Sequence, residues 1–186
     1  KWFNGVSFDS GRSALVALLQ AFDIGGGDEV LIQAFTCVAV PNSIRWAGAI
    51  PVYVDIDGNF NIDSKDLSKK VTKRSKAIVV QHTFGVPAQM DEILACAKKN
   101  KLIVIEDCAH SLGATHLPAG KAGKGKKVGT FGDAAFFSFG RDKVVSSVWG
   151  GMATVHVKHK MQRAKLKQFQ KKLPMPPRWW IAQQLF

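Results

Sequence analysis

Paired cysteines and long hydrophobic runs are both missing from this sequence of 186 residues. The cysteines, Cys37, Cys96 and Cys108, form no CxxC pair, and an odd, scattered set argues against both a disulfide scaffold and a zinc site. No apolar run approaches the roughly 20 residues of a membrane-spanning helix, and the first residues lack the apolar stretch of a signal peptide. These absences predict a protein of the reducing cytoplasm without a bound metal.

Acidic residues are missing from the last 44 residues of the chain. No Asp or Glu follows Asp142, whereas nine Lys or Arg residues occur from Lys143 onward. The net charge of +12 belongs mainly to this part, because residues 1–142 carry 17 basic and 14 acidic groups. Such a stretch can bind nucleic acid, anionic lipid or an acidic partner, or it can simply be the solvated face of a helix.

The two ends of the chain favour a trimmed protein. An initiator Met is absent, and the last residues, 178–186, start an apolar, aromatic segment after three nearby prolines. We therefore expect one domain over residues 1–157, then a basic helix and the start of a truncated C-terminal domain over residues 158–186.

Hydrophobic periodicity predicts helices and strands that alternate along the chain. Leu15, Leu18, Leu19 and Phe22 share one face of a predicted helix, and Asp63 or Ser64 is typical of a helix N-cap. The strands are apolar throughout, which favours an α/β fold with a mostly parallel sheet covered on both faces by helices. Helices are expected at 13–22, 38–47, 63–71, 88–99 and 158–172, and strands at 29–33, 50–56, 77–81, 102–106, 134–139 and 152–157.

Polar side chains follow three of the predicted strands at the point where each strand ends. They are His82, Asp107 and Ser138, and Lys143 comes shortly after the third. Ligands of open α/β sheets bind beyond the carboxyl ends of the strands, so we expect these residues to share a site. Pyridoxal phosphate needs such a set, namely a lysine for a Schiff base, a carboxylate opposite the pyridinium nitrogen, and hydroxyl groups for the phosphate.

Each of these residues also has a simpler interpretation. Taken singly, Asp107 could cap a helix, His82 could be a hydrogen-bonded core residue, and Lys143 could lie on the surface. Their common position at one edge of the sheet favours the shared site.

Two glycine-containing segments are further candidates for binding an anion. Ser10 is a plausible N-cap, and Gly11 lets backbone N–H groups approach an anion at the positive end of the first helix, although an ordinary cap would look the same. The segment 120–126 matches the first part of a P-loop, but Lys127 replaces the Ser or Thr that would bind magnesium. We interpret this segment as a flexible basic hairpin.

Taken in order, these segments resemble the DegT/DnrJ/StrS family of sugar aminotransferases, which are fold-type I pyridoxal phosphate enzymes. Each motif is weak alone, whereas their order and spacing are specific. The resemblance implies the large domain of that fold, a three-layer α/β/α sandwich, without most of the C-terminal small domain. The matching segments are 10–15, 27–32, 49–56, 80–85, 105–114, 129–133, 137–143 and 150–152.

The resemblance also implies roles for single residues. Lys143 would bind the cofactor covalently and move protons, and Asp107 would keep the pyridine nitrogen protonated. His110 stands where relatives usually carry Gln near the phenolic oxygen of the ring. The remaining expected cofactor contacts are Gly11, Arg12, Ser13 and Ser138 at the phosphate, Phe35 or Cys37 against the ring, and His82 nearby.

The activity that the resemblance implies is transfer of an amino group, from glutamate, to a nucleotide-linked keto sugar by a homodimer. Val144 and Trp149 depart from residues common in relatives, so substrate recognition does not transfer with the motifs. One alternative is a fragment that binds cofactor without turnover, or a member that dehydrates its substrate. Dehydrating members replace the lysine with His, so Lys143 favours transamination.

A second alternative is a non-enzymatic basic module that binds nucleic acid or membrane through residues 158–172. It leaves the polar residues at the strand ends unexplained. We therefore expect no nucleic-acid partner. Contact of the segment 178–180 with a membrane surface is the less favoured option beside packing against the missing domain.

Overall fold

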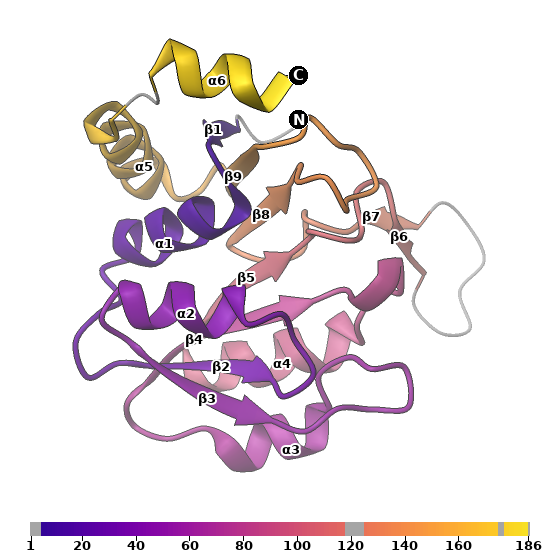
Figure 1. The fold of residues 1–186 in the computed structure, drawn as a ribbon. Helices are drawn as coiled ribbons and strands as arrows, with labels where there is room; N and C mark the ends of the chain where they lie inside the picture. Colours follow the sequence, from indigo (N-terminus) through magenta and orange to yellow (C-terminus); the bar gives the residue numbers. More distant parts are fainter. Residues whose placement is uncertain (1–4, 118–124, 175–176, 186) are drawn as a thin grey trace.

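A seven-stranded sheet forms the centre of the protein, in a computed structural model that describes residues 5–117, 125–174 and 177–185 (Figure 1). The strand order is β1-β9-β8-β5-β4-β2-β3. All pairs among β8, β5, β4, β2 and β3 are parallel, whereas β9 runs antiparallel to both β8 and β1. The strands are β1 (Val6–Phe8), β2 (Glu29–Gln33), β3 (Ile50–Val54), β4 (Ser75–Gln81), β5 (Ile103–Asp107), β8 (Ala134–Ser138) and β9 (Gly151–Val155).

Helices cover both faces of this sheet (Figure 1). On one face, Leu15 and Leu18 of α1 and Ile44 of α2 pack against side chains such as Val79 and Ile105 of the strands. On the other face, α3 and α4 cover the alternate side chains of the same strands. The helices are α1 (Gly11–Ala21), α2 (Ala39–Trp46), α3 (Ser64–Lys70), η1 (Thr83–Gly85), α4 (Met90–Asn100), α5 (Lys160–Lys172) and α6 (Arg178–Leu185).

The expected three-layer α/β fold with a mostly parallel sheet is confirmed. The strand at 29–33 has the predicted bounds, and Asp63 caps α3 by accepting hydrogen bonds from the Lys65 and Asp66 amides at 2.7 and 2.8 Å. The edge strand β1 and the antiparallel course of β9 were not anticipated. A three-residue strand such as β1 is too short to show a hydrophobic period.

The basic helix α5 packs on the main core. Its Leu166 is buried in the cluster that contains α1, and Lys165 pairs with Asp23 at the end of α1 at 2.6 Å. This amphipathic arrangement accords with the solvated-face interpretation of the charge. The domain boundary at residue 157 stays a prediction.

Two further expectations concern the surface. Most of the P-loop-like segment lies outside the described residues, and its last residue belongs to β7 (Lys126–Lys127), which pairs with β6 (Thr115–His116). Within the described ranges, every helix is too short or too polar to cross a membrane.

Candidate active site

The alternation of side chains along the strands decides which residues reach the candidate site. Ile105 of β5 packs on the α1 face of the sheet, and Val104 packs on the α4 face. Two residues further along, Asp107 therefore lies on the α1 face and Glu106 on the α4 face. The register pairs Gln81 with Asp107, so Gln81 also lies on the α1 face.

A cavity of about 680 Å³ opens on the α1 face beyond the carboxyl ends of β4, β5 and β8. Of the residues expected to contact the cofactor, eight line it, namely Gly11, Arg12, Phe35, Cys37, Asp107, His110, Ser138 and Lys143. Ser13 and His82 are not among the lining residues. The amine and the carboxylate, which come from distant parts of the sequence, thus face one cavity.

Asp107 is buried in the wall of this cavity, with 4% of its surface exposed. Burial raises the pKa of Asp107 to about 6, although the Ala109 amide, which donates to its Oδ1 at 2.9 Å, and the charge of Lys143 oppose the rise. Among the described residues, the Ala109 amide is the one hydrogen-bond donor to this carboxylate. The group can therefore accept a further donor from a ligand.

Lys143 extends its amine between two partners. The Nζ atom lies 2.9 Å from His110 Nε2 and 2.8 Å from Asp142 Oδ2. Burial, and then the positive charge of Lys143, lower the pKa of His110, whereas the hydrogen bond from Lys143 lowers the pKa of Asp142. A neutral imidazole and an ionised carboxylate are thus both available to accept a hydrogen bond from the Lys143 amine.

The ring of Phe84 lies beside that of His110. The two rings are stacked, with centroids 6.1 Å apart and an angle of 5° between their planes. Phe84 has a φ of 52°, in the left-handed region that non-glycine residues seldom adopt. Strained backbone of this kind is typical of ligand sites.

The first turn of α1 closes the cavity on the side of Ser138. Ser10 caps the helix by accepting from the Ser13 amide at 3.2 Å, and the two hydroxyl groups lie 3.1 Å apart. A Cβ atom on Gly11 would meet the Ser138 Cβ at 3.1 Å, so this glycine allows the helix to start against the end of β8. The helix dipole and the hydroxyl groups then favour an anion here.

The floor of the cavity holds polar residues that the sequence interpretation missed. Gln81 accepts a hydrogen bond from the Thr36 hydroxyl at 2.7 Å and donates to the Thr83 hydroxyl at 2.9 Å. All three residues line the cavity. No sequence pattern singles out Gln81, which lies one residue before His82 and on the opposite face of the sheet.

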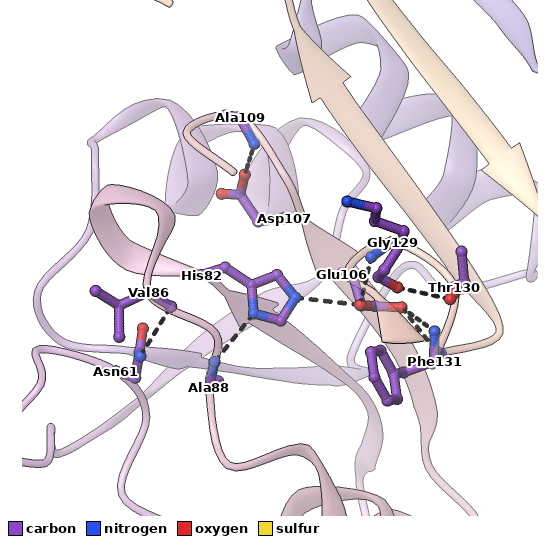
Figure 2. Close-up of polar contacts among 12 residues, drawn as sticks. Asn61, His82, Val86, Ala88, Glu106, Asp107, Ala109, Gly129, Thr130 and Phe131 are labelled. Carbon is purple, nitrogen blue, oxygen red and sulfur yellow. Dashed lines mark hydrogen bonds and ion pairs between the residues drawn. The ribbon is translucent and has the colours of Figure 1, made fainter. Parts of the chain in front are cut away.

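His82 lies on the other face of the sheet, where it is fully buried (Figure 2). Its Nδ1 accepts from the Ala88 amide at 3.1 Å, so the ring proton resides on Nε2, which lies 3.1 Å from Glu106 Oε2. The geometry favours the interpretation of His82 as a hydrogen-bonded core residue. Contact with a cofactor stays an untested prediction.

His82, Glu106 and Cys108 also approach one another closely enough to suggest a metal site, since their ligand atoms lie within 4.8 Å of one another. Glu106, however, also accepts from the amides of Gly129 and Phe131 (Figure 2) and from the amide of Gly132, each at 2.7 Å. With two donors on each oxygen, the carboxylate has no lone pair left for an ion. We interpret the cluster as a hydrogen-bonded one.

Comparisons with known proteins agree with this geometry. The model of the DegT/DnrJ/EryC1/StrS aminotransferase family matches residues 3–172. GDP-perosamine synthase of Caulobacter vibrioides is 40% identical over 154 residues, which are 82% of this chain and 40% of that protein. The chain thus spans well under half the length of such relatives.

Solved structures show the same fold. An aminotransferase from Psychrobacter cryohalolentis superposes with a TM-score of 0.77 and 37% identity, covering 88% of this chain and 40% of the other. NtdA from Bacillus subtilis, solved with bound cofactor PMP, gives a TM-score of 0.79 and 26% identity, covering 91% and 38%. The expected resemblance is confirmed, and the chain belongs to the DegT/DnrJ/EryC1/StrS aminotransferase family.

Proposed function

We propose that this protein binds pyridoxal 5′-phosphate in the cavity and transfers an amino group to a nucleotide-linked keto sugar. The observation that carries the proposal is that Lys143 and Asp107 face the same cavity, one with an amine and the other with a buried carboxylate. Bound pyridoxal phosphate would supply an aldehyde for amino groups and a ring that withdraws electrons from the reacting carbon.

The donor set of the cavity fits this cofactor. Asp107, with one donor among the described residues and a pKa of about 6, can accept the N–H of a pyridinium ring. Ser138 and the first turn of α1 offer hydroxyl groups and a positive helix end to a phosphate. Lys143 completes the set with a nucleophilic nitrogen.

The residues around Lys143 would prepare this amine. An ammonium must lose a proton before it can attack a carbonyl, and the neutral imidazole of His110 lies within reach of that proton. Asp142 would hold the amine at the cavity while the proton moves. Phe84 stacks on the imidazole ring.

The substrates are proposed from the relatives. GDP-perosamine synthase bears the name of a nucleotide-linked amino sugar, and NtdA was solved with PMP, the amine form of the cofactor. We propose a nucleotide-linked keto sugar as the acceptor and glutamate as the amino donor. The cavity is large enough for a cofactor together with part of a sugar substrate.

A homodimer is also part of the proposal. Large apolar side chains are exposed at the mouth of the cavity, including Val38 at 68%, Trp46 at 63% and Phe84 at 69%. Exposed apolar surface beside a site supports coverage by another protein surface. We also propose a cytoplasmic location, with residues 1–157 as the cofactor-binding domain.

An absorbance titration tests the function. Addition of pyridoxal phosphate to the purified protein should give a visible band that resists dialysis. The Lys143→Ala variant should bind the cofactor weakly and lack this band, while Lys158→Ala, on the surface, should retain it. A colourless wild-type protein at saturating cofactor would contradict the proposal.

A further inference from the structure

Glu106 is a buried carboxylate that the proposed chemistry does not use. Its side chain is 0% exposed and lies on the α4 face, next in sequence to Asp107 on the cavity face. Figure 2 shows Glu106 reaching His82 and the loop of residues 129–131, while Asp107 lies apart beside Ala109. The full burial of an ionisable side chain calls for a physical reason.

Four N–H groups surround the two oxygens of Glu106. Oε2 accepts from the Gly129 amide at 2.7 Å and lies 3.1 Å from His82 Nε2, while Oε1 accepts from the Phe131 and Gly132 amides, both at 2.7 Å. These donors belong to the segment that precedes β8 and to the residue that follows β4. Glu106 therefore joins the three strands that end at the cavity.

The loop is shaped for this contact. Gly129 has a φ of 82°, and a Cβ atom there would meet Phe137 Cζ at 2.9 Å and Cys108 Sγ at 3.2 Å. A Cβ atom on Gly132 would lie 2.5 Å from the Val104 carbonyl oxygen. Both positions require glycine for the loop amides to reach the carboxylate.

The backbone at Asp107 is held by the same strands. The His82 amide donates to the Asp107 carbonyl oxygen at 3.3 Å, and the Cys108 amide donates to the Phe136 carbonyl oxygen at 3.0 Å. A shift of the 129–132 loop or of His82 would thus move the peptide groups on either side of Asp107. The Asp107 side chain itself has the Ala109 amide as its hydrogen-bond donor within the described part of the chain.

We propose that Glu106 is a positioning residue: by binding His82 and the three loop amides beneath the sheet, it fixes the end of β5 so that the Asp107 carboxylate stays turned toward the cavity. His82 acts together with Glu106, because its Nε2–H group is the fourth hydrogen-bond donor to this carboxylate. This inference rests on the proposed binding of pyridoxal phosphate, because it assigns the support of the residue opposite the ring nitrogen.

Substitution of Glu106 by Gln tests the proposal with almost no change of volume. An amide keeps one acceptor oxygen and presents an NH₂ group to two of the N–H donors, so those contacts become repulsive. We expect the dissociation constant of pyridoxal phosphate, measured by the visible band, to rise by about tenfold. Affinity losses of this size are found when a residue that supports a ligand-binding side chain is replaced. The pH at which the band titrates should also move, because the contact of the ring nitrogen is altered.

Glu29→Gln is the matched control. Glu29 is also a buried carboxylate with several donors, from Thr72, Arg74 and Ser75, but it lies at the opposite end of the sheet at the start of β2. This variant should lose thermal stability while the cofactor affinity and the pH midpoint stay at wild-type values. Equal effects of the two variants on the cofactor would overturn the proposal.

Two substitutions of His82 decide the matter if Glu106→Gln fails to fold. Gln places an amide near the position of Nε2 and keeps the donor to Glu106, whereas Asn places an oxygen near Nδ1 and keeps the acceptor for Ala88. We expect His82→Asn to weaken cofactor binding by about fivefold, the worth of one hydrogen bond, and His82→Gln to change it less. The reverse order, or equal affinities, would contradict a role through Glu106.

The outcomes separate the two proposals. If the wild-type protein gives no visible band, the proposed function fails. If the wild type gives the band and folded Glu106→Gln binds the cofactor as tightly, the function stands and the positioning role of Glu106 is wrong.

Discussion

Two neighbouring carboxylates at the end of β5 differ in the number of their hydrogen-bond donors and in their access to the cavity. Within the described residues, Glu106, on the α4 face, has four N–H donors and is not among the residues that line the candidate site, whereas Asp107, on the α1 face, has one donor and lines the cavity of about 680 Å³. A saturated carboxylate contributes to folding, because its donors would otherwise be buried without acceptors. A carboxylate with spare acceptors and a raised pKa is available for a ligand.

Asp107→Asn should have the largest effect on cofactor binding. The amide cannot form an ion pair with a protonated ring nitrogen, and loss of one partner of a buried charge pair costs about 3 kcal/mol or more, which corresponds to about a hundredfold in affinity. Equilibrium titration with pyridoxal phosphate measures this change. Wild-type affinity in the variant would show that Asp107 does not bind the cofactor.

Glu106→Ala should have the largest effect on stability. Three amides and the His82 N–H would lose their acceptor, and each unsatisfied buried donor costs about 1–3 kcal/mol, so we expect a loss of about 3 kcal/mol or more. Urea unfolding of the cofactor-free protein gives the value. A loss below about 1 kcal/mol would mean that water or loop movement replaces the carboxylate.

The pH dependence of stability should differ between the wild type and Asp107→Asn. Burial raises the pKa of Asp107 from 3.8 to about 6, so between these values the folded protein binds more protons than the unfolded chain. The contribution of Asp107 to stability is therefore present at low pH and declines by about 3 kcal/mol in all as the pH rises from about 3 to 7. The difference between the unfolding free energies of the two proteins, followed against pH, isolates this group, and a flat difference would contradict the raised pKa.

His110→Gln should have the smallest effect of these changes. Gln can accept a hydrogen bond from Lys143 but cannot take its proton, so the rate of cofactor loading should fall while the affinity changes by less than about fivefold. Stopped-flow absorbance measures the loading rate. A variant that loads as fast as the wild type would show that His110 does not receive the proton.

The sequence predicted the fold and the residues of the cavity face better than those of the opposite face. Lys143 and Asp107 were placed at one site because the carboxyl ends of parallel strands meet at one edge, and both line the cavity. Ser138 was placed by the same argument. The fold class was predicted from the alternation of helices and strands and from the apolar sequences of the strands.

The face on which each polar residue lies could not be predicted. Strands β4 and β5 are apolar on both sides, so their sequences carry no alternation that distinguishes the α1 face from the α4 face. His82 and Gln81 therefore looked equivalent, although His82 shares a face with Glu106 and Gln81 with Asp107. The ring stacking of Phe84 on His110 depends on a positive φ, which no pattern indicated.

Chemical trapping of the cofactor shows whether Lys143 is the residue that binds pyridoxal phosphate covalently. Reduction of the pyridoxal phosphate complex with borohydride, followed by digestion and mass spectrometry, identifies the lysine that carries the cofactor. We expect a single phosphopyridoxyl group on the peptide that contains Lys143, and none in Lys143→Ala. A label on another lysine, with Lys143 unmodified, would contradict it.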